Sequence, residues 1–257
     1  MRLIILGSGT SFGIPQIGCQ CAVCRSSDPR DRRTRVAAVV ESDAGERILI
    51  DTPPELRLQL VAAGVVSVAA VLYTHDHADH IHGIDDLRAF TSRHGPLPIY
   101  GPADTLERLT SRFKYIFDDR TPRQPETPRP DLTPRPLQAG VETTIAGLPV
   151  LPFEFEHGLT RVYGYRIGAL AYLTDVKAVP AETVERLRGV RLLVISALFD
   201  RPHPAHLSIP EAVAVARAVG AERTLLTHLT HRYGHGELAA LLPPGVEPAF
   251  DGLSVSF

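Results

Sequence analysis

Short apolar runs bounded by turn residues recur along the chain, and they predict β-strands. The runs are Leu3–Leu6, Val36–Glu41, Ile48–Asp51, Ala69–Thr74, Leu151–Phe155, Ala171–Thr174, Leu192–Ile195, Thr224–Thr227 and Leu253–Phe257. Apolar positions recur at helical spacing in Glu55–Ala63, Asp104–Phe117, Ala181–Leu187, Pro210–Val219 and His235–Leu242. The second half of the chain therefore alternates strand and helix, the first half is mostly strand, and the pattern predicts an α/β fold.

The stretch TPRQPETPRPDLTPRP (Thr121–Pro136) is rich in proline and polar residues. Proline removes a backbone donor and disrupts helices, so neither a helix nor a central strand is expected here. We interpret the stretch as a surface loop or extended connector. A role in shaping access to a substrate site is the alternative.

Metal-binding side chains follow one of the buried strands directly. In VLYTHDHADHIHG, the apolar run is followed by His75, His77, Asp79 and His80. The end of a strand lies at a sheet edge, where a site can open to solvent. Imidazole and carboxylate suit Zn²⁺, Mn²⁺ or Fe, so His75 and His77 can face one ion while Asp79 and His80 face a second.

Four other strands end in a residue of the same kind. Asp51 ends RILID, His157 ends VLPFEFEH, Asp175 ends LAYLTD and His228 ends TLLTH. Each alone would be interpreted as a cap or a satisfied polar residue. Together with the histidine cluster they indicate one shared site.

These motifs, in this order, resemble the metallo-β-lactamase superfamily over nearly the whole chain. The resemblance implies a single domain over 1–257 with a four-layer αββα sandwich, and Asp51 orienting a ligand histidine. It also implies two divalent ions, Mn²⁺ or Zn²⁺, with these ligands: His75, His77 and His157 for one ion, Asp79, His80 and His228 for the other, and Asp175 bridging both. Two such ions can activate water and stabilise attacking and leaving oxygens.

Three further stretches narrow the resemblance: LGSGTSFGIPQIGCQCAVC, DPRDRRTR and PHPAHLSIPEAV. Together they resemble the phosphodiesterase family of the carbon–phosphorus lyase pathway. That family opens 5-phosphoribosyl 1,2-cyclic phosphate to ribose 1,5-bisphosphate, so the resemblance implies a small-molecule cyclic phosphate substrate and a homodimer. Ribonuclease Z shares the opening but has a long tRNA-binding arm, for which this sequence shows no candidate. A non-catalytic relative of the pyrroloquinoline-quinone biosynthesis type is the third hypothesis.

His206 and Asp79 are the predicted catalytic residues, with Asp79 also a metal ligand. Ser208 and Glu211 form the pattern of a capping box, which starts a helix just after His206. His206 would then clamp the phosphate or protonate the leaving oxygen. Four arginines follow the cysteines and are interpreted as a solvated face, with contact of one or two of them to the 5-phosphate as the alternative: Arg30, Arg32, Arg33 and Arg35.

All three cysteines of the chain lie in GCQCAVC, as Cys19, Cys21 and Cys24. An odd, tight cluster favours a metal site over disulfides, and Cys₃His is an accepted zinc set. His231 and His235 are both available, and the related phosphodiesterases close their zinc at the His231 position. We therefore predict a structural Zn²⁺ that holds an N-terminal loop, about 13–35.

Composition bears on the binding partners and the location of the protein. The 257 residues carry a net charge of −2, which disfavours broad nucleic-acid binding. No apolar run approaches the roughly 20 residues that span a bilayer, so no membrane association is expected. The start, MRLIILGSGT, is apolar for only four residues after Arg2, which is too short for a signal-peptide core, so we expect a cytoplasmic location, where thiols stay reduced.

Overall fold

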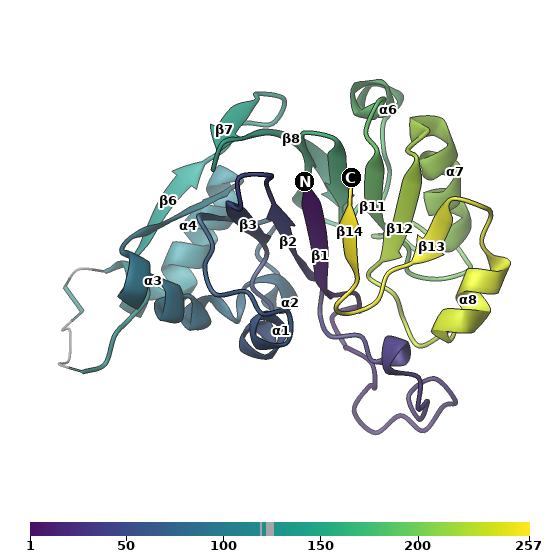
Figure 1. The fold of residues 1–257 in the computed structure, drawn as a ribbon, viewed down its shortest axis with the longest axis horizontal. Helices are drawn as coiled ribbons and strands as arrows, with labels where there is room; N and C mark the ends of the chain where they lie inside the picture. Colours follow the sequence, from purple (N-terminus) through teal and green to yellow (C-terminus); the bar gives the residue numbers. More distant parts are fainter. Residues whose placement is uncertain (119, 122–125) are drawn as a thin grey trace.

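The computed structural model describes residues 1–118, 120–121 and 126–257. Within these residues the strands form two seven-stranded sheets, seen nearly edge-on in Figure 1. The first sheet contains, in spatial order, β14 (Ser254–Ser256), β1 (Arg2–Gly7), β2 (Ala37–Glu41), β3 (Arg47–Ile50), β4 (Ala70–Leu72), β5 (Leu97–Gly101) and β6 (Leu132–Pro136). The second contains β13 (Val246–Pro248), β12 (Arg223–Thr227), β11 (Leu192–Ser196), β10 (Leu170–Leu173), β9 (Thr160–Ile167), β8 (Leu148–His157) and β7 (Thr143–Ile145).

Helices cover the outer face of each sheet. The first sheet is covered by α1 (Leu56–Ala62), α2 (Ala78–Ile81), the 3₁₀ helix η2 (Ile84–Leu87), α3 (Arg88–His94), α4 (Ala103–Arg112) and α5 (Lys114–Phe117). The second is covered by α6 (Ala181–Leu187), α7 (Ile209–Val219) and α8 (His235–Leu241). A further 3₁₀ helix, η1 (Pro29–Asp31), lies in the N-terminal loop.

The apolar side chains divide into three cores because both faces of each sheet are buried. On β1, Leu3 and Ile5 pack in the core between the sheets, whereas Ile4 and Leu6 pack against the helices. This alternation follows from the two-residue period of a strand. It also explains why the strand sequences are continuously apolar. The predicted four-layer αββα sandwich is confirmed.

The site-bearing strands run in the same direction within each sheet. Strands β3 and β4 are parallel, as are β10, β11 and β12. Strand β8 is antiparallel to β9, which is antiparallel to β10, so β8 and β10 also share a direction. The carboxyl ends of parallel strands meet at one edge, and this brings the predicted ligands together.

The sequence pattern missed several elements. Strands β5, β6, β7, β9 and β13 and helices α2 and α3 were not predicted, and the helix predicted over Asp104–Phe117 breaks at Phe113 into α4 and α5. The stretch Thr121–Pro136, predicted as a surface loop or extended connector and not a central strand, forms an edge strand, β6, over Leu132–Pro136. Because β6 is an edge strand, its prolines interrupt no further pairing. Residues 122–125 of that stretch lie outside the described residues.

Within the described part of the chain, none of the helices combines the length and apolar character needed to cross a membrane.

Candidate metal centre

A cluster of histidines occupies the edge where β4 and β8 end. Ligand atoms of His75, His77 and His157 lie within 4.8 Å of one another. The ring centroids of His75 and His77 are 4.5 Å apart, and those of His77 and His157 are 5.0 Å apart. His77 is exposed whereas His75 and His157 are buried, so this part of the site opens to solvent. The structure thus brings together the three residues predicted for one ion.

The residues predicted for the second ion form an adjoining group. Ligand atoms of Asp79, His80 and His228 also lie within 4.8 Å of one another. Asp79 and His80 belong to α2, the short helix after the His75–His77 loop, and His228 directly follows β12. Two segments far apart in sequence therefore meet at one edge of the sandwich.

Asp175 lies between the two groups. Its Oδ1 is 3.1 Å from Nε2 of His228, and its Oδ2 is 3.3 Å from Nε2 of His80. His75, His80 and Asp175 also have ligand atoms within 4.8 Å of one another. Asp175 therefore reaches His75 of the first group as well as His80 and His228 of the second, which is the position expected of a bridging ligand.

Asp51 and Thr74 hold the ligand rings from behind. The Asp51 carboxylate lies 2.7 Å from Nδ1 of His80 and accepts hydrogen bonds from the backbone N–H and the hydroxyl of Thr74, each 2.8 Å long. The Thr74 hydroxyl lies 3.0 Å from Nδ1 of His75. Such contacts fix the orientation of ligand rings and leave Nε2 of each ring directed toward the site.

Three residues of the site adopt a left-handed backbone conformation. The φ angles of Asp51, Asp175 and His228 are 61°, 57° and 56°. A non-glycine residue in this region is uncommon, and such strain costs about 1–3 kcal/mol and clusters at functional sites. The backbone turns sharply at these strand ends and brings the side chains into the site.

His206 lies beside both groups. Its Nδ1 is 3.4 Å from Oδ1 of Asp175, and its ring stacks on His228 at 4.9 Å between centroids. The predicted capping box is confirmed, since Ser208 and Glu211 cap α7 reciprocally. The carbonyl of Ala205 lies 3.0 Å from Nδ1 of His157, which holds this segment against the site. His157, Asp175 and His206 also form a potential metal-binding group. The position of His206 is therefore compatible with a metal ligand as well as with the predicted contact to the substrate.

The charges of the site are strongly coupled. Burial lowers the pKa of His75 and His228, so their rings are neutral, the form that binds metals. Burial opposes ionisation of Asp175, but His228 and His80 outweigh it and hold the pKa of this carboxyl well below its usual range. Burial disfavours charge on His80, yet Asp79, Asp51 and Asp175 raise its pKa well above the ordinary value. Burial lowers the pKa of His206 to about 3.

Divalent cations fit this donor set. Among the described residues, buried ring nitrogens without a hydrogen-bond partner include Nε2 of His75, and leaving such an atom unsatisfied costs about 1–3 kcal/mol. A metal ion would satisfy it. Neutral imidazoles and carboxylates are ligands of Zn²⁺ and Mn²⁺, so the site fits divalent metals of this kind.

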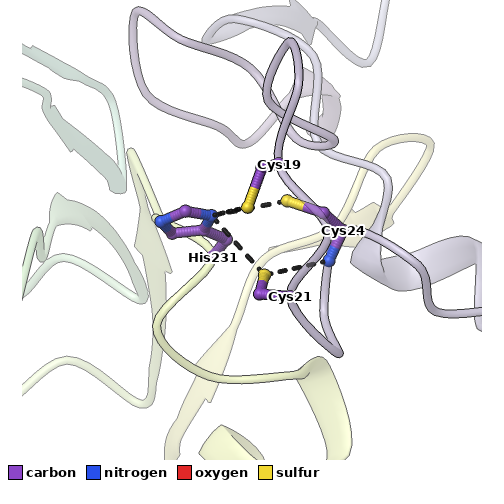
Figure 2. Close-up of side chains that lie close together, drawn as sticks. All are labelled: Cys19, Cys21, Cys24 and His231. Atoms are coloured by element: carbon purple, nitrogen blue, oxygen red, sulfur yellow. Dashed lines mark hydrogen bonds between the residues drawn. The ribbon is translucent and has the colours of Figure 1, made fainter.

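The three cysteines surround His231 in a second cluster (Figure 2). Nδ1 of His231 lies 3.4 Å from Sγ of Cys19, 3.6 Å from Sγ of Cys21 and 3.4 Å from Sγ of Cys24. Tetrahedral zinc with its usual bond lengths would separate sulfur and nitrogen by about 3.5 Å. His235 instead begins α8, as the sequence predicts. The geometry fits a closed Cys₃His zinc site that joins the N-terminal loop to the segment after β12.

The structure corrects the interpretation of the arginine run. Arg33 is 1% exposed, and its guanidinium donates to the carbonyls of Thr230 and Tyr233 and lies 3.4 Å from Asp31. It is therefore neither a solvated residue nor available to a phosphate. These bonds fix both sides of His231, a role that has no signal in the local sequence.

The other arginines of the run are occupied by protein partners or point outward. Arg30 pairs with Asp28 at 2.7 Å, and Arg35 pairs with Glu55 and donates to the carbonyl of Ser11. Arg32 is exposed. Among the described residues, none of the hydrogen bonds or ion pairs of these four arginines involves a residue of the histidine cluster.

An ion-pair cluster around the buried Asp76 supports the HDH turn, and sequence analysis missed it. Asp76, between His75 and His77, is buried and lies 3.0 Å from Nε of Arg108 and 2.7 Å from Nη2 of Arg112. Arg112 also donates to the Asp76 carbonyl. Both arginines belong to α4, so this helix holds the turn that carries the first two ligands.

Comparison with known proteins decides the family. Residues 46–229 match the family described as the beta-lactamase superfamily domain. The chain belongs to the metallo-β-lactamase superfamily. Together with the donor set described above, this fold supports a metal-dependent hydrolase.

Solved structures of the superfamily agree with this assignment. A new diphosphatase from the PhnP family has a TM-score of 0.90 and 39% identity, and the match covers 100% of this chain and 97% of that one. Zn(2+)-bound PqqB from Methylobacterium extorquens has a TM-score of 0.82 at 18% identity, covering 100% of both chains. The short form of human tRNase Z has a TM-score of 0.70 at 19% identity, and the match covers 100% of this chain and 99% of that one. The last two share the fold.

Curated relatives are longer than this chain. An octanoyltransferase of Porphyromonas gingivalis is 41% identical over 262 residues, which cover 98% of this chain and 51% of the relative. Coenzyme PQQ synthesis protein B of Rhodopseudomonas palustris is 30% identical over 166 residues, or 58% of this chain and 53% of the relative. The chain thus spans about half the length of these relatives.

Proposed function

We propose that this protein is a metal-dependent phosphodiesterase that hydrolyses a small cyclic sugar phosphate. The observation that carries the proposal is the position of Asp175, which lies beside His228 and His80 of one ligand group and within 4.8 Å of a ligand atom of His75 in the other. One ion would be held by His75, His77 and His157, the other by Asp79, His80 and His228. Two bound divalent ions activate water and stabilise the charge of phosphoryl transfer.

The residues around these ligands have separate tasks in the proposed reaction. Asp51 and Thr74 fix the rings of His80 and His75. Exposed His77 marks the side from which substrate and water enter. His206 lies near Asp175 and would hold a phosphate oxygen or give a proton to the leaving sugar oxygen. In hydrolysis, a water oxygen bonds to phosphorus, the ester P–O bond breaks, and the leaving oxygen takes up a proton.

The sequence resemblance selects 5-phosphoribosyl 1,2-cyclic phosphate as the substrate to test, with ribose 1,5-bisphosphate as product. The similar PhnP-family structure is a diphosphatase, which also cleaves bonds to phosphorus. Nothing in the described site accounts for octanoyl transfer, and the relative of that name matches this chain over only half its length.

The decisive experiment follows hydrolysis by ³¹P NMR with protein loaded with Mn²⁺ or Zn²⁺. We expect conversion of the cyclic phosphate, and loss of that conversion after chelation. An oligonucleotide substrate serves as the comparison, because a ribonuclease Z type enzyme would cleave the oligonucleotide in preference. Tight binding of both metals without turnover of any phosphodiester would instead support a non-catalytic relative of the PQQ-synthesis type.

A homodimer remains part of the proposal, as the family resemblance implies. Sedimentation of the purified protein tests it, and a monomer at all concentrations would contradict it.

A further inference from the structure

A pocket of about 290 Å³ adjoins the candidate metal centre. His206 and His228 of that centre form part of its wall, and Phe199 and His203 line it from the segment after β11. Its volume is near the lower end of the range for small-molecule sites, about 300–1,000 Å³. The pocket can therefore hold the sugar of a substrate whose reacting phosphate lies at the metals.

The pocket wall also offers hydrogen-bonding groups from the N-terminal loop. Thr10 lines the pocket and is buried, and its hydroxyl has no hydrogen-bond partner among the described residues. The half-buried Gln16 lines the pocket as well, and its amide can both donate and accept hydrogen bonds. An unpaired buried polar group is unfavourable, so this wall favours a ligand with hydroxyl groups, such as a sugar.

Two cations beside the pocket are already paired with carboxylates. Arg232 follows His231 of the pocket wall and lies 3.1 Å from Asp200. Lys177 lies 3.3 Å from Glu211. Because Arg232 balances the charge of Asp200, this carboxylate does not neutralise the next residue in the chain, an arginine.

That residue, Arg201, keeps an unbalanced positive charge next to the pocket. Its side chain is exposed, and no carboxylate of the described residues forms an ion pair with it. The guanidinium lies 6.0 Å from the centre of the Phe199 ring, which forms part of the pocket wall. Burial lowers the pKa of His203, a second residue of this wall, and the charge of Arg201 adds to that effect. An exposed guanidinium without a carboxylate partner therefore faces two residues of the pocket.

We propose that Arg201 binds the terminal phosphate of a sugar phosphate whose cyclic ester lies at the metals. The inference rests on the proposed phosphodiesterase activity and assigns the 5-phosphate contact that the arginines after the cysteines do not supply. A guanidinium can donate two parallel N–H groups to one phosphate. The pocket then holds the ribose between the two phosphates, with Thr10 and Gln16 beside its hydroxyls. Arg201 is in this assignment a residue that determines specificity, and it does not take part in the chemical step.

A binding experiment tests this without turnover. Isothermal titration calorimetry compares ribose 1,5-bisphosphate with ribose 1-phosphate on zinc-loaded protein, because the two ligands differ only in the terminal phosphate. We expect the bisphosphate to bind about 10-fold more tightly, near the lower end of the effect of a hydrogen bond to a charged group. The preference should shrink as salt is raised, since Arg201 is exposed. Equal affinities, or no binding of either ligand, would overturn the inference.

Variants identify where the preference arises. Arg201→Ala should remove most of the preference for the bisphosphate, and Arg201→Lys should retain part of it, because lysine keeps the charge but not the bidentate geometry. Arg217→Ala is the matched control, since Arg217 is also exposed but lies in the last turn of α7, outside the pocket wall. It should leave the preference unchanged. A preference that survives Arg201→Ala, or that falls equally in Arg217→Ala, would overturn the assignment.

Kinetics separate this inference from the proposed function. Methyl p-nitrophenyl phosphate has no terminal phosphate and reports whether the unaltered protein cleaves phosphodiesters at all. The kcat/KM for 5-phosphoribosyl 1,2-cyclic phosphate should exceed that for the same cyclic ester without its 5-phosphate by about 10-fold. Arg201→Ala should narrow this difference by raising KM. Equal kcat/KM values in the unaltered protein would refute the inference alone. No hydrolysis of any diester would refute the proposed function, while the binding experiment would still decide the role of Arg201.

Discussion

Asp51 and His80 form a fully buried pair, with 2.7 Å between the carboxylate and Nδ1 of the ring. Asp51 follows β3 and His80 lies in α2, so the pair joins two separate segments. It leaves Nε2 of His80 facing Asp79 at 3.4 Å and Asp175 at 3.3 Å. The carboxylate behind the ring thus selects which nitrogen is available to a metal.

Asp51→Asn is expected to weaken zinc binding about 10- to 100-fold, the usual effect of losing a carboxylate behind a ligand histidine. Asparagine keeps the volume and tolerates the left-handed backbone at this position, so the fold should persist. Competition with a chromogenic chelator measures the affinity. Asp43→Asn, at an exposed position, is the control, and equal zinc affinity in both variants would remove the role assigned to Asp51.

Asp76→Asn is expected to destabilise the metal-free protein by about 1 kcal/mol. The effect is modest because Arg108 and Arg112 remain exposed to water when their partner loses its charge. Zinc affinity should also fall, since the HDH turn becomes less ordered. Urea unfolding of chelated protein and zinc competition measure the two effects.

Asp104→Asn is the matched control for this variant. Asp104 pairs with the same Arg108 at 2.8 Å but is 59% exposed. Its loss should change neither quantity. If Asp104→Asn and Asp76→Asn behave alike, the buried position of Asp76 has no special role.

The candidate ligands could be predicted from sequence because they lie at the ends of apolar strands or shortly after them. Asp175 and His228 are examples, since their strands are recognisable and share an edge. The residues that hold the ligands in place could not be predicted from sequence, because their partners lie on other elements. Nothing near Asp76 in the sequence indicates that two arginines of α4 meet it, and nothing near Arg33 indicates the carbonyls around His231.

There are also physical reasons why the sequence pattern did not predict strands β9 and β6. Gly164 interrupts the apolar pattern of β9, yet a side chain there would lie 2.5 Å from Leu173 and 2.8 Å from Phe155. Glycine is therefore required by close packing rather than by a turn. Strand β6 contains two prolines, which the sequence alone cannot distinguish from a loop until its edge position is known.

Asp175→Ala is expected to abolish turnover and to lower the metal content of both catalytic positions. The reason is that this carboxylate lies beside His80 and His228 of one ligand group and close to His75 of the other. Elemental analysis after gel filtration gives the stoichiometry. Unchanged metal content with a near-normal rate would exclude a bridging role for Asp175.

His206→Ala is expected to retain the catalytic metals and to lose much of kcat, about 10²–10⁴-fold if the ring acts as a general acid. The loss should shrink with a p-nitrophenyl ester, since that leaving group needs no proton. An equal loss on both substrates would indicate a phosphate clamp. A lower metal content would instead show that His206 is a ligand, which its position beside His157 and Asp175 also permits.

His231→Ala is expected to release about one zinc and lower thermal stability, while the two catalytic metals stay in place. Nδ1 of His231 lies 3.4–3.6 Å from all three sulfurs, so the ring completes the set that Cys19, Cys21 and Cys24 begin. Structural zinc contributes its binding energy to folding, and its loss frees the N-terminal loop. Cys21→Ser should have the same effect, because it removes a zinc ligand that the N-terminal loop contributes. His235→Ala is the control, because this histidine is buried in α8 outside the cluster and should leave the zinc count unchanged even if it lowers stability. An unchanged zinc count in both His231→Ala and Cys21→Ser would defeat the assignment of a Cys₃His site.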